Sequence, residues 1–461
     1  MKRPATILGL TCALVMLVWG QSAVALGRTG GDAWNTQSSG TPVNLTAVSF
    51  PAGDASHGWA VGTDRTILAT TNGGAQWSVQ ASGGTYPPGL EGVCFLDATH
   101  GWVVGRSGAY GVTTILATTD GGAHWDAQGL SIPWYPSNDL YSVSFPDASH
   151  GWAVGWCATG GESILATTDG GANWNVQSSG TGARLYSVSF PAGDASHGWA
   201  VGEQGRILAT TDGGVHWVAQ DSGGDYWTDL SSVSFPDASH GWAVGTWEDT
   251  HMVWHGLILA TTDGGANWTA RTPSTVTQLH GVYFRDASHG WATGGIGYNG
   301  WITLILATTD GGVHWNLQNP NTTVFLNAVC FPDTSNGWAV GAGGLVEATA
   351  CGGSVPDTVP PTTQAPSSAS ARRGRNATLK YRVTDALPNN GLATVTLKVK
   401  NRAGRVKMTL PQYVKAVNTT FSTRMRVPRT WKVGTYRFFV YAVDAAGNAQ
   451  SKVGSNRLIV R

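Results

Sequence analysis

Short apolar segments alternate with turns rich in glycine, aspartate, serine and proline along most of this 461-residue chain. Residues 185–217 show the full pattern: LxxVSF, then GWAVG, then ILAT, then a segment that begins at the Trp of DGGVHW. Short runs of β-branched and aromatic residues bounded by turn residues predict β-strands. No repeat keeps a helical apolar period long enough for a helix, so each unit predicts four antiparallel strands and the fold class is all-β.

The unit recurs seven times, which predicts a β-propeller with one blade per unit. Its core, HGWAVG, returns with small changes at His57, His100, His150, His197, His240, His289 and, as NGWAVG, at Asn336. The seventh copy lacks a fourth strand after Cys351, whereas residues 30–37 have the pattern of a fourth strand with nothing before it. We therefore predict a seven-bladed propeller whose N-terminal strand completes the seventh blade and removes an exposed sheet edge.

The ends of the chain differ from the repeats. Residues 1–25 have two basic residues, an apolar run and an Ala-Val-Ala cleavage site, which predicts a signal peptide and a secreted or cell-surface protein. No later segment is apolar enough to span a membrane. The propeller is predicted over residues 26–353, a Pro/Ser/Thr linker over 354–370, and a small Ig-like or fibronectin-like β-sandwich over 371–461.

The zero net charge hides an asymmetry between these domains. Residues 1–354 hold 25 Asp and Glu against 9 Lys and Arg, whereas the remainder holds 3 against 19. Two hypotheses follow for the basic domain: it docks on the acidic propeller, or it binds an anionic cell-wall polymer. We expect no nucleic-acid partner. The cysteines Cys94, Cys157, Cys330 and Cys351 show no regular spacing and are predicted to be core thiols rather than a disulfide framework or a metal site.

The repeated acids and histidines are the obvious candidates for chemistry, but their even spacing argues against it. Residues at the same place in every blade lie on a circle, so they cannot converge on one substrate as a glycosidase pair must. We predict that the aspartates cap turns beside glycines, that the histidines hydrogen-bond in turns, and that no metal or cofactor is bound. The His251, His255, Glu248 and Asp249 cluster is likewise predicted to be a solvated loop. The capping aspartates are Asp120, Asp169, Asp212, Asp263 and Asp310.

The segment TTDGGANW at Thr167–Trp174 matches the Asp-box of bacterial neuraminidase repeats. Together with VSFPD and HGWAVG, it makes residues 29–353 resemble the photosystem II stability and assembly factor family of seven-bladed propellers. The resemblance implies a non-enzymatic binding or assembly scaffold, and a role in photosystem II assembly if the source is photosynthetic. A secreted Asp-box glycoside hydrolase, of sialidase or xyloglucanase type, is the enzyme alternative. A sialidase would need an arginine cluster and a tyrosine with an acid partner, and the propeller arginines are scattered along the sequence.

The loops after strands two and four of each blade share one face of the disc, and these loops differ most between copies. They are rich in Trp and Tyr, which suit peptide capture or sugar stacking. We therefore predict a protein or glycan site on that face, whose candidate residues are Trp134, Tyr135, Tyr226, Trp227, Trp247, Glu248, Trp254, Tyr298 and Trp301.

Overall fold

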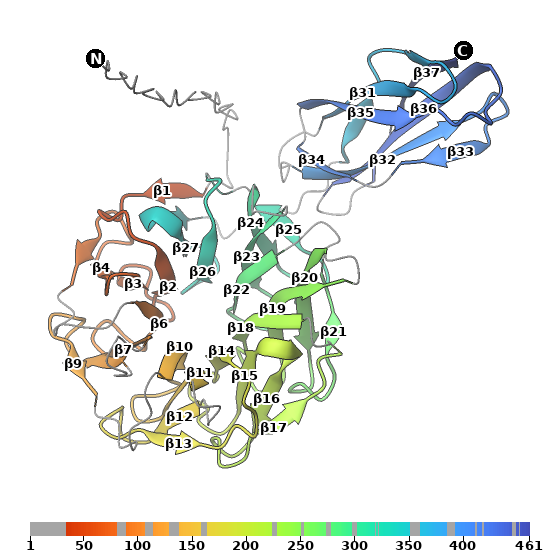
Figure 1. The fold of residues 1–461 in the computed structure, drawn as a ribbon. Helices are drawn as coiled ribbons and strands as arrows, with labels where there is room; N and C mark the ends of the chain where they lie inside the picture. Colours follow the sequence, from red (N-terminus) through yellow and green to blue (C-terminus); the bar gives the residue numbers. More distant parts are fainter. Residues whose placement is uncertain are drawn as a thin grey trace, which may run out of the picture. The chain divides into compact units, whose positions relative to one another are not determined.

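The computed structural model describes two all-β units, a propeller over residues 34–350 and a C-terminal unit over residues 360–461 (Figure 1). The described residues are 34–80, 89–106, 114–128, 138–157, 164–223, 228–249, 253–272, 278–296, 302–318, 320, 322–350, 360–384, 392–410, 413–416, 419–444, 449–450 and 452–461. The predicted signal peptide lies outside them. In these ranges no helix is long and apolar enough to cross a membrane.

The propeller has seven four-stranded antiparallel sheets in its described residues, and each sheet is one blade. Two short 3₁₀ turns, η1 (Glu203–Gly205) and η2 (Ala342–Gly344), join the second and third strands of two blades. From the inner to the outer strand, the blades are β2 (Leu45–Ser49), β3 (Gly58–Gly62), β4 (Ile67–Thr70) and β5 (Ser78–Val79); β6 (Leu90–Phe95), β7 (Gly101–Gly105), β8 (Thr114–Thr118) and β9 (Asp126–Ala127); β10 (Asn138–Ser144), β11 (Gly151–Cys157), β12 (Ile164–Thr167) and β13 (Asn175–Gln177); β14 (Leu185–Ser189), β15 (Gly198–Gly202), β16 (Ile207–Thr210) and β17 (Val218–Gln220); β18 (Thr228–Ser234), β19 (Gly241–Glu248), β20 (Trp254–Thr261) and β21 (Thr269–Ala270); β22 (Gln278–Phe284), β23 (Gly290–Ile296), β24 (Ile302–Thr308) and β25 (Asn316–Gln318); and β26 (Leu326–Cys330), β27 (Gly337–Gly341), β28 (Val346–Thr349) and β1 (Asn35–Gln37).

The N-terminal strand closes the ring, as the sequence predicts. β1 pairs with β28 in antiparallel register, with Asn35 opposite Ala348. Just before β1, the fully buried Trp34 donates from Nε1 to Oε1 of Gln318 over 2.7 Å and meets the Phe331 ring edge-on. The first and last residues of the propeller therefore complete one blade together.

The repeated Trp and Phe side chains join neighbouring blades. Trp199 of β15 is buried and stacks on Phe235 of the next blade, with ring centroids 3.6 Å apart and planes within 1°. Its Nε1 donates to the Gly264 carbonyl over 2.9 Å. Gly241 must lack a side chain because a Cβ there would collide with the Phe235 ring. Large flat rings fill the wedge between twisted sheets, so HGWAVG is framework.

The Asp-box aspartates cap the turn between the third and fourth strands. Asp212 Oδ1 accepts bonds from Thr210 Oγ1 and from the His216 amide, each over 2.9 Å. The His216 amide and imidazole, together with Thr210, lower the pKa of Asp212 to about 2. Gly213 and Gly214 follow with positive φ of 70° and 84°, which an L side chain rarely adopts. These bonds agree with the structural role predicted for the box.

The histidines of HGW are also held within turns. His197 Nδ1 lies 2.8 Å from Asp194 Oδ2, and Asn336 donates to Asp333 over 2.8 Å at the equivalent place in the seventh blade. In the described residues, no group of three His, Cys, Asp or Glu side chains is placed to hold a metal ion. Cys94 and Cys330 are free thiols.

The C-terminal unit has two sheets around one apolar core. The core includes Leu379, Tyr381, Leu397, Phe438 and Leu458, which come from both sheets. The smaller sheet holds β29 (Thr362–Gln364), β31 (Asn376–Thr384) and β35 (Thr419–Arg426), and the larger holds β30 (Ala369–Ala371), β37 (Gly454–Val460), β36 (Gly434–Asp444), β32 (Leu392–Lys400), β33 (Val406–Thr409) and β34 (Tyr413–Ala416). Assignment to the Ig-like class stays a prediction.

The predicted linker is too long at its C-terminal end. Strand β29 and most of β30 lie inside residues 354–370, and Thr363 is buried with its hydroxyl bonded to the Val440 carbonyl over 2.8 Å. A short edge strand rich in threonine and proline has the composition of a linker, and its pairing with β31 appears only in three dimensions.

Candidate binding site

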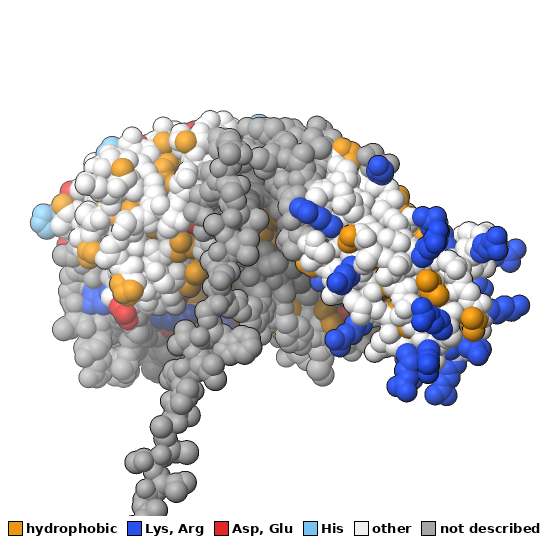
Figure 2. Space-filling model, turned by 90° about the horizontal axis from the view of Figure 1, so that it is seen from above, with side chains coloured by type: hydrophobic (Ala, Val, Ile, Leu, Met, Phe, Trp, Pro, Cys, Tyr) orange, Lys and Arg blue, Asp and Glu red, His pale blue; other side chains and the backbone are white. Residues whose placement is uncertain are grey.

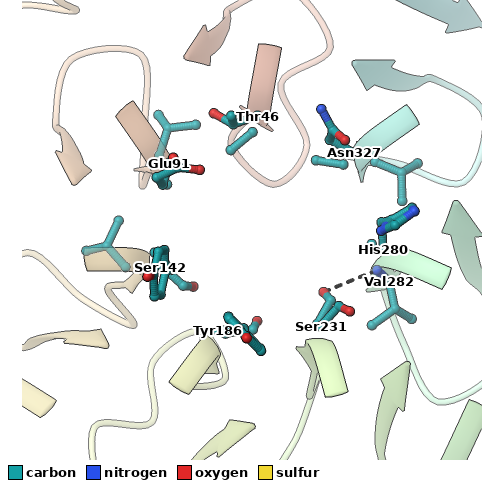
Figure 3. A pocket seen from close by; sticks show the side chains of 18 of the residues that line it. Thr46, Glu91, Ser142, Tyr186, Ser231, His280, Val282 and Asn327 are labelled. Carbon is teal, nitrogen blue, oxygen red and sulfur yellow. Dashed lines mark hydrogen bonds between the residues drawn. The ribbon is translucent and has the colours of Figure 1, made fainter. Parts of the chain in front are cut away.

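A β-bulge interrupts the inner strand of every blade at the same place. In β14 the pairing with β15 passes from Leu185 directly to Ser187, so Tyr186 is the extra residue. A bulge re-aims a side chain, and here the extra residue faces the central channel (Figure 3). The corresponding residues of the seven blades are Thr46, Glu91, Tyr141, Tyr186, Ser231, His280 and Asn327.

The residue after each bulge is small, and this lets the inner strands approach one another around the channel. A Cβ at Gly92 would lie 3.0 Å from the Tyr141 carbonyl oxygen of the next blade. Where serine occupies the position, its hydroxyl accepts a bond from the next inner strand, as Ser187 does from the Val233 amide over 3.2 Å. The wall encloses a cavity of about 500 Å³, which is within the usual range for ligand sites.

One side of the channel carries an ion pair whose acid is mostly buried and whose arginine is exposed. Glu91 Oε1 lies 2.6 Å from Arg106 Nε, and the carboxylate is 17% exposed whereas the guanidinium is 53% exposed. Burial raises the pKa of Glu91, and the charge of Arg106 opposes that rise. Arg106 also lies 5.9 Å over the ring of Tyr141, which contacts Tyr186 at 5.7 Å.

A second charged cluster lies around the blade of β14–β17. Arg184 lies 4.5 Å over the Trp156 ring and 3.5 Å from Oε1 of Glu203, which also accepts a bond from the Tyr186 hydroxyl over 3.1 Å. Burial and the charge of Glu203 raise the pKa of Tyr186, so this phenol stays protonated. Burial also raises the pKa of Asp229, despite a bond from the Gln204 amide.

The opposite side of the channel is uncharged at neutral pH. Thr46 and Asn327 donate to backbone carbonyls of neighbouring strands over 2.7 and 2.8 Å. His280 differs, because its buried Nε2 has no hydrogen-bond partner among the described residues, and burial lowers its pKa. A neutral imidazole therefore lines the channel with one ring nitrogen unsatisfied (Figure 3).

Three of the loop residues predicted as a site fall within the described ranges. Trp247 and Glu248 end β19 and Trp254 begins β20, where Glu248 pairs with Trp254. The predicted loop is thus partly a strand hairpin, since the ladder of the blade continues into the insertion. These three residues do not line the channel. Six other predicted site residues lie outside the described ranges: Trp134, Tyr135, Tyr226, Trp227, Tyr298 and Trp301.

The hairpin also holds part of the cluster predicted as a solvated loop. His255 stacks on Trp247 at 4.5 Å, and its Nε2 lies 3.0 Å from Asp249 Oδ2. His255 is therefore an ordered partner of an aromatic ring and an acid rather than a free loop residue. His251 lies outside the described ranges.

Sequence reasoning missed the channel residues. Their signal is the second position of LxxVSF, where six residue types occur in seven copies while the flanking Leu and Val repeat. Arg106 and Arg184 are far apart in sequence, yet both line the channel. In a ring of repeats, arginines that are far apart in the sequence can therefore line the same channel.

The fold and channel define the class as an Asp-box β-propeller with side chains of both charges around its axis. The family model "Photosynthesis system II assembly factor YCF48" matches residues 88–178, 134–217 and 176–274. Residues 88–274 are thus similar to the photosystem II assembly factor family of propellers.

Solved structures show the same fold at low identity. A YCF48 bound to D1 peptide is 20% identical, with a TM-score of 0.53 over 70% of this chain and 98% of its own. YCF48 from Cyanidioschyzon merolae is 22% identical, with a TM-score of 0.54 over 69% and 98%. An ancestral GH74 enzyme is 12% identical, with a TM-score of 0.52 over 93% of this chain and 64% of its own. No curated protein matches the chain.

Proposed function

We propose that this protein is a non-enzymatic, extracytoplasmic scaffold that binds a segment of a partner protein at the mouth of the propeller channel. One observation carries the proposal: a framework repeated seven times presents six different residue types at its seven bulges. If those residues served only to close the ring, one residue type would suffice at all seven places. Variation on a constant frame is the pattern of a recognition surface.

A peptide suits the chemistry of the wall better than a glycan. The channel offers both charges through Glu91 and Arg106, together with two tyrosines and the side chain of His280. The backbone and the mixed side chains of a peptide can pair with these charged and polar groups. A sugar would need exposed ring faces for stacking, but the tyrosines are packed on each other and on Arg106. The solved YCF48 bound to D1 peptide supports a peptide ligand at the level of the fold.

The predicted aromatic loops would extend this site, because the bulges lie near the start of each inner strand, on the face that holds the variable loops. Export by the predicted signal peptide would place the site outside the cytoplasm. A photosystem II client follows only for a photosynthetic source.

Peptide-display selection against the full chain tests the proposal. We expect enriched peptides whose affinity falls about tenfold or more in Tyr141→Ala and Tyr186→Ala variants, because buried aromatic anchors dominate binding. His197→Ala on the opposite face is the control and should bind as the wild type does. Selection of no peptide, or equal loss in the control, would refute the proposal, and a hit on a parallel glycan array would replace the ligand class.

A glycosidase is the second candidate, favoured by one cluster. Tyr186 donates to Glu203 beside Arg184, and Asp229 is a carboxyl whose raised pKa suits a general acid. The raised pKa of Tyr186 opposes a role as nucleophile. Turnover of a chromogenic glycoside panel by the wild type, abolished in Glu203→Gln, would establish this candidate over the scaffold.

A further inference from the structure

Four arginines converge at one end of the C-terminal unit. Arg372 and Arg373 follow β30, Arg461 follows β37, and Arg429 lies between β35 and β36; together they line a surface pocket of about 380 Å³. All four residues are exposed. Figure 2 shows Lys and Arg side chains over the visible surface of this unit. Four like charges at one place repel one another unless an anion joins them.

The backbone holds these arginines together. The Arg373 amide donates to the Arg461 carbonyl over 3.0 Å, which locks the end of β30 to the end of β37. The Gly374 amide donates to the Val427 carbonyl over 2.8 Å and fixes the turn that carries Arg429. Gly374 has a φ of +78°, and a Cβ there would lie 3.1 Å from Arg429 Cγ and Nε, so the arginine packs over a bare backbone.

Among the described residues, no Asp or Glu side chain forms an ion pair with the four arginines. Of the three acids after residue 354, only Asp444 is described, and it ends β36. The other end of β36, at Gly434, is the one that pairs with Val460 beside the cluster, so Asp444 lies about 30 Å away along the strand.

A row of basic residues continues the positive surface across the larger sheet. Lys400 of β32 lies opposite Arg437 of β36, and Arg437 lies opposite Arg457 of β37. Like charges directly opposite on neighbouring strands destabilise a sheet, so the row has a cost to folding. Arg457 and Arg461 share one face of the chain and lie about 13 Å apart, which joins the row to the pocket.

We propose that this surface is a binding site for a linear phosphodiester polymer, with one phosphate in the four-arginine pocket and later phosphates along the Lys400, Arg437 and Arg457 row. Guanidinium groups match phosphate oxygens with paired hydrogen bonds. A single phosphate would leave the row unpaired, whereas a polymer serves both parts. The proposal is independent of the propeller site.

The aromatic residues of the same face argue against nucleic acid. Lys400 Nζ lies 4.6 Å over the Phe439 ring, and Lys398 Nζ lies 5.1 Å over the Tyr441 ring. These rings are covered by lysine side chains and do not form the stacking platform that single-stranded bases use. The surface offers charge without base stacking.

Binding of the full chain to a purified glycerol-phosphate polymer, measured by calorimetry, tests the proposal. We expect affinity to fall about tenfold in Arg372→Gln/Arg373→Gln, because two charge-assisted bonds are lost. The matched control is Lys380→Gln/Arg424→Gln, which removes two exposed charges from the smaller sheet and should change affinity by about twofold or less. Raising salt from about 50 to 300 mM should weaken binding strongly.

Three results would overturn the site. Equal loss in the control double variant would mean general attraction to a basic domain. Binding to dextran as tight as to the polymer would show that the surface does not recognise phosphate groups. Tighter binding to single-stranded or duplex DNA at the same phosphate concentration would assign the surface to nucleic acid. An unchanged thermal midpoint shows that each variant is folded, and peptide binding by the propeller should be unaltered in all of them.

Discussion

Replacing Arg106 by Gln should destabilise the propeller more than replacing its partner Glu91. The two charges are centred about 4 Å apart, which corresponds to about 4 kcal/mol at an effective dielectric of about 20. Arg106 is 53% exposed, so solvent screens much of this attraction and about 1–2 kcal/mol remains. Arg106→Gln leaves the buried carboxylate without its cation, whereas Glu91→Gln frees an arginine that water can reach.

The loss of unfolding free energy in Arg106→Gln should depend on pH. The pKa of Glu91 is raised in the folded protein, and losing Arg106 raises it further. A carboxyl with a raised folded pKa favours folding below its unfolded pKa and opposes folding as pH rises through the folded value. The variant should therefore lose most stability at pH 7 and much less near pH 4.

Urea unfolding followed by tryptophan fluorescence measures this, because only Trp19 and Trp431 of the 22 tryptophans lie outside the repeats. Glu91→Gln and the double variant should stay within about 0.5 kcal/mol of wild type at both pH values. Arg271→Gln, an exposed arginine after the outer strand β21, is the control. The reasoning would be refuted if Glu91→Gln and Arg106→Gln lost equal unfolding free energy, or if the loss in Arg106→Gln were the same at pH 7 and pH 4.

Three further predictions concern the framework. The thermal midpoint should be flat above about pH 5 and fall between about pH 4 and 2, because hydrogen bonds lower the pKa of box acids such as Asp212 to about 2 and stability is lost as these carboxylates protonate. Trp34→Ala should cost about 3–5 kcal/mol of unfolding free energy and raise amide exchange in β28, because Trp34 is fully buried. The control Trp217→Ala should cost less, because Trp217 is only partly buried and lies in a blade made from continuous chain. Cys330→Ser should shift stability by less than about 1 kcal/mol, since serine accepts the same amide in other blades, and the native thiol should resist alkylation because burial raises its pKa to about 12.

The framework was predictable because each blade repeats its own signals. A missing strand after Cys351 and an orphan strand at Trp34 could belong only together, and β1 pairs with β28 as expected. The channel was not predictable in the same way. The pattern of alternation places the second residue of LxxVSF within a strand, and only the bulge turns Tyr186 or His280 toward the axis.

The edges of elements were also harder to predict than their centres. The insertion that begins at Trp247 has no strand pattern of its own, but it continues a ladder already built by GWAVG. Thr363 is buried because β31 and β36 lie beside it. The local sequence, rich in proline and threonine, does not predict pairing with these strands. Long-range pairing decides both cases.

The closing strand has a consequence for the order of folding. Asn35 pairs with Ala348, and Phe50 stacks on Trp338 with centroids 3.7 Å apart, so closure joins residues about 300 positions apart. Such non-local contacts form slowly because a long loop must close first. Blades made early can fold, but the N-terminal strand β1 has no partner until β28, which ends at Thr349, has been synthesised. Ring closure is therefore expected to be the last and rate-limiting step, and a nascent or truncated chain is most exposed to edge-to-edge aggregation before it.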